Sequence, residues 1–99
     1  MSSRELEIAA ALATVESQIA AAAAKAGRDR SEITLIAVTK TYPASDVEIL
    51  RNLGVQNFGE NRNEEGVAKS AQVSGTWHFQ GQVQSRKLRD IAGWASFIH

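Results

Sequence analysis

Apolar runs alternate with helical patterns along this chain, and no other feature constrains its fold as strongly. The runs with strand character end near Lys40, Gly59, Gly81 and His99, about twenty residues apart. A stretch of helical periodicity separates each run from the next. This order predicts right-handed strand–helix–strand units and a parallel sheet. The short repeat is typical of a (β/α) barrel, of which four strands make half.

The boundaries of the expected elements follow from turn and capping residues. A first helix is expected over 4–26, because Ser2 and Glu5 have capping-box spacing and Gly27 can end it. The four strands are expected at 33–39, 55–60, 76–81 and 96–99, and the helices between them at 45–53, 61–72 and 85–94.

Three further details are expected within these helices. A second capping box should begin at Ser45, and Ser85 should cap the last helix. Gly66 should interrupt the helix in which it lies. Taken together, the patterns predict an α/β fold. It would be a partial (β/α) TIM-type barrel with about four parallel strands, covering helices and an extra N-terminal helix, in a single domain over 1–99.

Composition limits the function classes. The 99 residues include eleven basic and eleven acidic side chains, so there is no general electrostatic reason to bind nucleic acid or an anionic membrane. Cysteine is absent, which excludes disulfides and thiolate metal sites. The alanine-rich start is interrupted by charges, and no segment is expected to be long or apolar enough to span a bilayer. These features predict a soluble, cytoplasmic protein.

Lys40 directly follows the apolar run 33–39, an unusual place for a charge. Side chains alternate along a strand, so Lys40 shares a face with Val38, Ile36 and Thr34. If that face lines a barrel, the amine stands at its mouth, where burial favours the neutral, nucleophilic form. This predicts Schiff-base chemistry with a carbonyl compound. The alternative is a lysine that extends from a strand end into solvent.

Four segments resemble one protein family. In order along the chain, they read "AGRDRSEITL", "LIAVTKTYP", "NFGENRNEE" and "WHFQGQVQSRK". They are similar to the YggS/PROSC-type pyridoxal phosphate homeostasis proteins, relatives of the barrel domain of alanine racemase, and the similarity covers almost the whole chain. The resemblance implies that Lys40 holds pyridoxal 5′-phosphate (PLP) as an aldimine. It also implies that Asn61 lies beside the cofactor ring and that His78 borders the pocket.

The chain departs from the family pattern in two ways. Arg62 and Arg86 stand where the family often has an aromatic residue and an asparagine. Family members are more than twice as long, and in barrels generally the phosphate lies in loops after the seventh and eighth strands. The resemblance therefore implies the first half of such a protein, with the covalent anchor but without the phosphate-binding loops.

The other candidate residues have structural alternatives. Asn61 is also suited to a turn at a strand end, and His78 to a hydrogen-bonded core position. No ligand pair has metal-site spacing, so no metal is expected. Three basic residues at a helix start could hold an anion but are more often a solvated face: Arg86, Lys87 and Arg89.

The predicted function is PLP binding in intracellular PLP homeostasis, without enzymatic turnover, with the cofactor and amino acids as small-molecule partners. Two alternatives stay open: a remnant of a PLP-dependent amino-acid racemase that uses Lys40 as its base, and a barrel fragment with no ligand. Half a barrel has two free sheet edges, so the isolated chain is also expected to self-associate.

Overall fold

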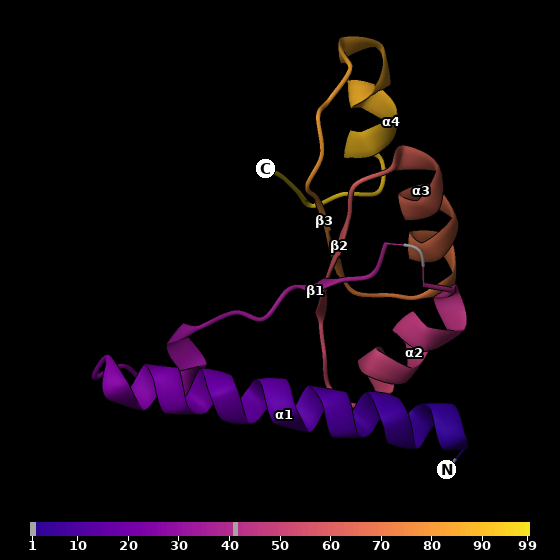
Figure 1. Ribbon diagram of the computed structural model, residues 1–99. Coiled ribbons are helices and arrows are strands. Elements are labelled where there is room, and N and C mark those ends of the chain that lie inside the picture. The colour runs from indigo at the N-terminus through magenta and orange to yellow at the C-terminus, as the bar shows by residue number, and fades with distance from the viewer. Residues whose placement is uncertain (1, 41) are drawn as a thin grey trace. The chain divides into compact units, whose positions relative to one another are not determined.

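The computed structural model describes residues 2–40 and 42–99, and the chain forms two compact units, Met1–Leu35 and Ile36–His99. Figure 1 labels most of the elements of both units. The first unit, the helical unit, contains α1 and a short 3-10 helix. The second, the sheet unit, contains all four strands and the remaining helices.

The helical unit is built on α1, which covers Ser3–Lys25. The expected capping box is confirmed, because the Ser2 side chain accepts from the Glu5 amide and the Glu5 carboxylate accepts from the Ser2 amide. Gly27, at φ 71°, follows the helix end as predicted. A 3-10 helix follows at Arg30–Glu32. The Arg30 guanidinium ties it to α1 by donating to both carboxylate oxygens of Glu16, at 3.0 and 2.9 Å.

Helix α1 corrects one expectation from the sequence. It has 23 residues and an 18-residue stretch of mean hydropathy 1.3, so by length and composition alone it is long and apolar enough to cross a membrane. The expectation that no segment meets this criterion is therefore wrong. Alanine accounts for most of the hydropathy, and Glu16 lies near the middle of the helix. A charge at the centre of a membrane helix costs about 2.5–3.5 kcal/mol, so the criterion is weak evidence for a membrane helix here.

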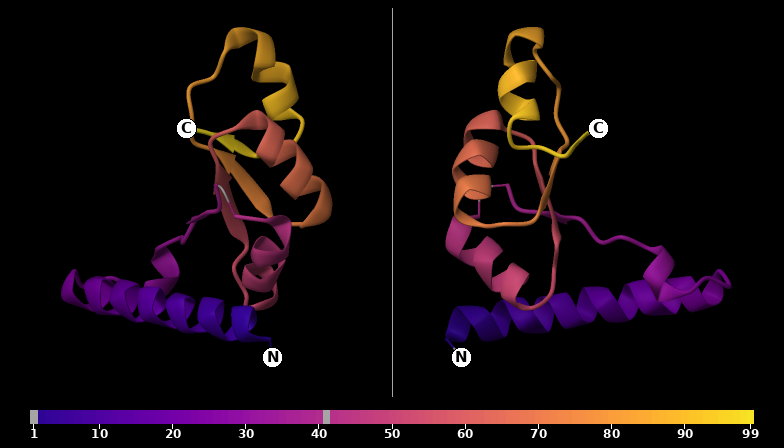
Figure 2. Two further views of the ribbon diagram at one scale, coloured as in Figure 1. Left: turned by 45° about the vertical axis from the view of Figure 1, so that its right-hand side comes forward. Right: turned by 180° about the vertical axis from the view of Figure 1, so that it is seen from behind.

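The sheet unit has the predicted alternation of strands and helices. Its strands are β1 (Ala37–Val38), β2 (Asn57–Glu60), β3 (Thr76–Phe79) and β4 (Phe97–Ile98), all parallel and in the order β1-β2-β3-β4. The helices are α2 (Ala44–Asn52), α3 (Asn63–Gln72), the 3-10 turn Ser85–Lys87 and α4 (Leu88–Ala92). Figure 2 shows β2 and β3 side by side, with α3 along one face of them.

One face of the sheet, here called the covered face, lies against these helices. Paired residues of a parallel ladder point to the same face, so Phe58 and Trp77 lie together, with ring centroids 5.2 Å apart. The apolar side chains of the sheet unit that are almost fully buried are Val47, Val55, Phe58, Val73, Trp77, Phe79 and Ile91. The core of the unit thus lies between the strands and α2, α3 and α4.

The opposite face, here called the open face, carries the row of paired residues Val38, Gly59, His78 and Phe97. No helix of the sheet unit covers it (Figure 1). Val38 is 48% exposed and Phe97 is 53% exposed, large values for apolar residues of a strand. In a closed barrel this row would face the interior. The predicted fold class is confirmed. The chain is an α/β half-barrel in which helices cover one face of the sheet and leave the other face open.

Several local predictions are wrong. A strand is expected over 33–39, but β1 covers only Ala37–Val38, with one further ladder bond from the Thr39 amide to Gly59. Ser45 does not cap α2: Pro43 takes the N-cap position and no side chain caps that end. Ser85 likewise caps neither the 3-10 turn nor α4. Gly66 lies inside an uninterrupted α3.

Candidate functional site

The register of the sheet places Lys40 and Asn61 at the same edge. Val38 pairs with Gly59, and Lys40 and Asn61 each follow two residues later. Neighbouring strands lie about 4.8 Å apart, so the two backbones leave the sheet side by side. The ladder extends to the last residue before Lys40, because the Thr39 amide donates to the Gly59 carbonyl at 3.0 Å.

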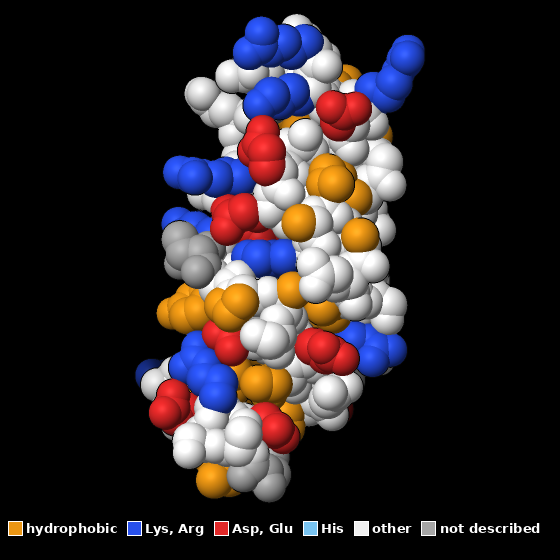
Figure 3. Space-filling view, turned by 90° about the vertical axis from the view of Figure 1, so that its right-hand side faces the viewer, with side chains coloured by type: hydrophobic (Ala, Val, Ile, Leu, Met, Phe, Trp, Pro, Cys, Tyr) orange, Lys and Arg blue, Asp and Glu red, His pale blue; other side chains and the backbone are white. Residues whose placement is uncertain are grey.

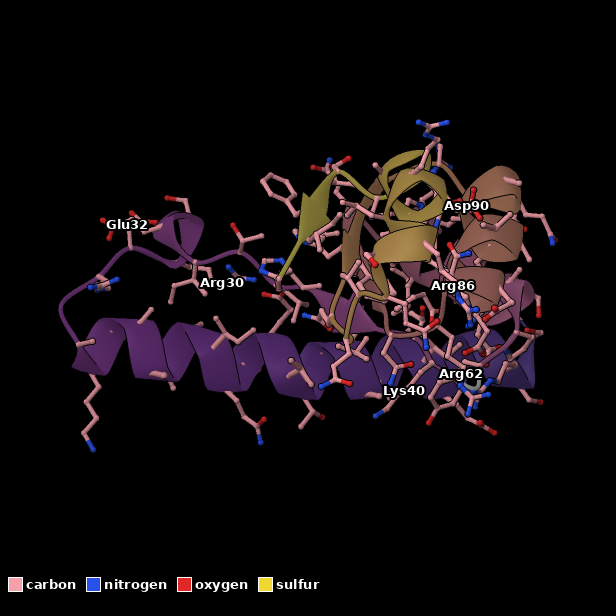
Figure 4. The ribbon with its side chains drawn as sticks, turned by 90° about the horizontal axis from the view of Figure 1, so that it is seen from above. Arg30, Glu32, Lys40, Arg62, Arg86 and Asp90 are labelled. Atoms are coloured by element: carbon pink, nitrogen blue, oxygen red, sulfur yellow. The ribbon has the colours of Figure 1, made fainter. Side chains whose placement is uncertain are left out.

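Lys40 is exposed, and it forms no ion pair with any other residue that the structure describes. The expected burial above an apolar floor is not present in this chain. The physical reason is the open face: Val38, one step back on the same side, is itself half exposed. In Figure 4 the labelled side chains of Lys40 and Arg62 lie next to each other in projection and point the same way, out of the ribbon.

Asn61 is also exposed, in the bend that follows β2. Its side chain forms no hydrogen bond with another described residue, so the amide is available to a ligand. Its backbone is tightly packed: a Cβ at Gly81 would lie 2.8 Å from the Asn61 carbonyl oxygen, too close for any side chain. Glycine at position 81 therefore lets the end of β3 approach the backbone that carries Asn61.

His78 is the most constrained of the predicted site residues. It is 5% exposed and lies on the open face, paired in register with Gly59. One ring nitrogen is 3.0 Å from Asn57 Oδ1 and the other is 3.0 Å from His99 Nε2. The Phe97 ring stacks on it at 4.9 Å.

Burial lowers the pKa of His78 below the ordinary value of 6.5, and the nearby His99 ring lowers that pKa further. His78 is thus neutral and hydrogen-bonded at both nitrogens. Both ring nitrogens are engaged within the protein, so His78 has the hydrogen-bonded core position that the sequence left open as its alternative.

Gln80 also lies on the open face, next to the candidate residues, although the sequence did not single it out. An ideal Cβ at Gly59 would lie 2.7 Å from Gln80 Oε1, so the glutamine amide lies across the open face of β2. Gln80 follows His78 by two residues and reaches the level of Asn61. The signal for it was the alternation of the strand, which puts every second residue after His78 on the same face.

A buried ionic cluster lies behind Lys40 and was also missed. Lys69 Nζ donates to Glu60 Oε1 and to the Thr39 carbonyl oxygen, both at 2.6 Å, and Thr39 Oγ1 donates to the same carboxylate oxygen at 2.6 Å. Glu60 is 0% exposed and Lys69 6%. The signal was present in α3, where Gly66, Lys69 and Val73 recur at i, i+3 and i+7 and form its buried stripe.

The basic residues before and within α4 do not form part of this site. Figure 3, which views the helical side of the sheet unit, shows lysine and arginine side chains gathered at its α4 end and acidic ones among them. Lys87 pairs with Glu64 at 3.3 Å, and Arg86 and Arg89 are exposed. These residues have the character of a solvated face.

Two surface grooves of the sheet unit lie elsewhere. One, of about 570 Å³, lies between α3 and α4 and is lined by Val67, Ala71, Trp77 and Trp94 among others. The other, of about 540 Å³, lies at the amino ends of β2 and β3. Neither groove includes Lys40, Asn61 or His78.

Known proteins resemble this chain over almost its whole length. A pyridoxal phosphate homeostasis protein of Mycobacterium leprae is 42% identical over 108 residues, which cover 97% of this chain and 42% of the relative. The protein of the same name from Escherichia coli K12 is 43% identical over 99 residues, covering 94% of this chain and 42% of the relative. The chain thus spans about two fifths of the length of the curated relatives it matches. No family model matches it.

Solved structures are also similar to this chain over most of its length. PipY of Synechococcus elongatus is 33% identical in its PLP-free structure, with a TM-score of 0.67 over 82% of this chain and 40% of PipY. Its PLP-bound structure is 34% identical, with a TM-score of 0.62 over 82% of this chain and 41% of PipY. An unknown protein from Bifidobacterium adolescentis is 28% identical, with a TM-score of 0.90 over 100% of this chain and 46% of that protein.

Proposed function

The chain is homologous to pyridoxal phosphate homeostasis proteins over almost its whole length, and on that premise we propose that it binds PLP through the amine of Lys40. Asn61 would lie beside the cofactor ring, and His78 would border the site as a neutral hydrogen-bonded ring. PLP supplies an aldehyde that reacts reversibly with amines, and the protein supplies one amine at a defined place.

The observation that carries the proposal is the position of Lys40 at the carboxyl edge of the sheet. Its amine is exposed and has no ion-pair partner among the described residues, so an aldehyde can reach it. Asn61 leaves the sheet beside Lys40 and is also exposed, and the missing Cβ of Gly81 lets the end of β3 approach the Asn61 backbone. These features fit the aldehyde end of PLP. The curated relatives are named for PLP homeostasis, and PipY has been solved with PLP bound.

The test is to identify the lysine that reacts. The chain is incubated with PLP, the reversible lysine–aldehyde bond is reduced with borohydride, and the modified residue is mapped by mass spectrometry. We expect Lys40 to carry most of the label at low PLP concentration. Lys25 and Lys87 are the reference lysines, because both are at least partly exposed on helices or turns. Lys69 is a poor reference, because it is buried and paired.

A Lys40→Arg variant is the matched control. It keeps the charge but offers no amine that condenses with an aldehyde. The label on the whole chain should therefore fall to what Lys25 and Lys87 carry. Equal labelling of Lys25, Lys40 and Lys87 in the unmodified chain would overturn the proposal. Label at an unrelated dominant position would do the same.

We further propose that the whole protein buffers PLP in the cytoplasm and does not turn over a substrate, with amino acids as exchange partners for the bound cofactor. The support is the name shared by the curated relatives. The racemase alternative makes a different prediction. It requires exchange of the α-proton of alanine in heavy water in the presence of PLP, which a buffering protein does not catalyse.

We also propose that residues 1–99 belong to a single domain and that the isolated chain associates with further copies of itself. The support is the unfinished sheet: β1 and β4 each have one paired neighbour, and Val38, Phe97 and Ile98 are strongly exposed. Exposed edges and apolar patches of this kind favour association between copies.

A further inference from the structure

A buried lysine, Lys69, contacts the turn that carries Lys40 from the covered face of the sheet. The Thr39 carbonyl oxygen accepts two hydrogen bonds, one from the Tyr42 amide at 3.1 Å and one from Lys69 Nζ at 2.6 Å. The first closes the turn in which Lys40 lies, and the second ties the start of that turn to α3. Lys69 therefore acts on the residue directly before the candidate PLP-binding lysine.

The same cluster holds the strand that leads to Asn61. Glu60 Oε1 accepts from both Lys69 Nζ and Thr39 Oγ1, so one carboxylate oxygen joins the ends of β1 and β2. Glu60 immediately precedes Asn61 along the chain. The backbones of the two candidate PLP-binding residues are thus fixed to each other through one ion pair, which lies on the covered face of the sheet.

Stability alone is a poor explanation for this pair. Moving two charges out of water is costly, and well-packed apolar residues of similar size often serve a core at least as well. The cost is raised further here, because Glu60 Oε2 is buried and has no hydrogen-bond partner among the described residues. A second carboxylate, Glu65, lies 3.7 Å from Lys69 and is partly exposed. The charged pair adds directional hydrogen bonds, which hold the carbonyl and the hydroxyl group of Thr39 in place together.

We propose that Lys69 and Glu60 are positioning residues that set the orientation of Lys40 and Asn61 for PLP. This inference rests on the proposed binding of PLP at Lys40. Lys69 and Glu60 would not touch the cofactor, because they lie on the opposite face of the sheet. They would act through Thr39 and through the peptide bond between Glu60 and Asn61.

The test compares three forms of the full 99-residue chain. The first is the unmodified chain. The second is the double variant Lys69→Met with Glu60→Gln, which removes both buried charges together and leaves neither unpaired. The third is the matched control Lys87→Met with Glu64→Gln, which removes an exposed ion pair of the same residue types that also involves α3. Far-ultraviolet circular dichroism establishes that each form is folded.

Two readouts separate positioning from folding. The first is hydrogen exchange of the peptide that contains the Thr39 and Tyr42 amides, both hydrogen-bonded in the structure. The second is the share of borohydride-trapped PLP on Lys40 relative to Lys25. In the buried double variant we expect faster exchange at 39–42 and a fall on the order of tenfold in the Lys40 share, because small misplacements of reacting groups have large effects on reactivity. The exposed control should match the unmodified chain in both.

The outcomes are distinguishable. If the unmodified chain shows no preference for Lys40, the proposed function fails, while the exchange readout still decides whether Lys69 and Glu60 hold the turn. If a folded double variant exchanges and labels like the unmodified chain, the positioning role is overturned. If the double variant does not fold, Thr39→Val, which removes only the hydroxyl bond to Glu60, is tested with the same readouts. Unchanged values for that variant would also overturn the role.

Discussion

Replacing Gly66 with alanine sets helix propensity against packing, and the two effects have opposite signs. Gly66 is buried in the interior of α3, where alanine is favoured over glycine by about 0.5–1 kcal/mol. Against this, a Cβ at position 66 would lie 2.2 Å from Trp94 Cζ2 and 2.3 Å from Cη2. Real Cβ atoms do not approach carbon so closely, so the indole must move.

The contacts of Trp94 set the cost of that movement. Its indole nitrogen donates to Asn63 Oδ1 at 2.8 Å, and its ring meets Trp77 and Phe79 edge-on at 6.5 and 6.0 Å. Losing the hydrogen bond costs about 1 kcal/mol, and each aromatic contact about 0.5–1.5 kcal/mol. After the gain in helix propensity is subtracted, we expect Gly66→Ala to lower the free energy of unfolding by about 2 kcal/mol, within the usual range for overpacking.

Urea unfolding followed by circular dichroism at one fixed protein concentration measures this change. With a slope of about 1–2 kcal/mol per molar urea, the midpoint should fall by about 1–2 M. The control is the same substitution in a Trp94→Leu background, where the obstructing ring is gone and Gly66→Ala should be neutral or stabilising. A raised midpoint for Gly66→Ala in the unmodified background would refute the packing argument.

Two further predictions concern His78 and the open face. Burial lowers the pKa of His78 below 6.5, so its contribution to stability is present above about pH 6.5 and is lost as the pH falls from there through the folded pKa. The urea midpoint should therefore drop as the pH is lowered below about 6.5. The drop should be smaller in His78→Gln, and an equal drop in both would contradict the prediction. Sedimentation equilibrium at micromolar concentration should show association, and a single monomeric species would contradict the effect expected of exposed edges and apolar side chains.

The order and direction of the strands could be predicted from the sequence, because each depends on local patterns. Apolar runs of strand length, separated by helical periodicity, leave a right-handed parallel arrangement as the main solution. The position of Lys40 at a strand end followed from the same alternation.

The helix caps were less predictable. Ser45 and Ser85 have suitable residue types, but Pro43 takes the N-cap of α2, and no side-chain cap forms at either helix. Cap geometry depends on how the preceding loop arrives, which a spacing rule does not contain.

The buried cluster could not be predicted because it depends on two elements at once. Lys69 occupies an inward position of α3 that periodicity would assign to an apolar residue, while Val67, the apolar residue nearby, is 47% exposed. A lysine is acceptable there only because Glu60 from β2 and the Thr39 carbonyl from β1 are both within reach. The helical spacing places Lys69 on the inward stripe of α3, but it does not say which residues of the strands, up to 30 positions away, meet it there.

The two faces of the sheet would divide the requirements of the proposed PLP site between them. The covered face is complete within this chain, so Thr39, Glu60 and Lys69 can fix the backbone beside Lys40 without any further element. The open face is not complete within this chain, because Val38 and Phe97 remain exposed and no helix of the sheet unit lies over them. On the positioning proposal, the orientation of the Lys40 amine would therefore be a property of the chain itself. Exclusion of water from it depends on whatever covers the open face, and a partner that buries Val38 should increase the preference for Lys40 over Lys25 without any change at Lys69.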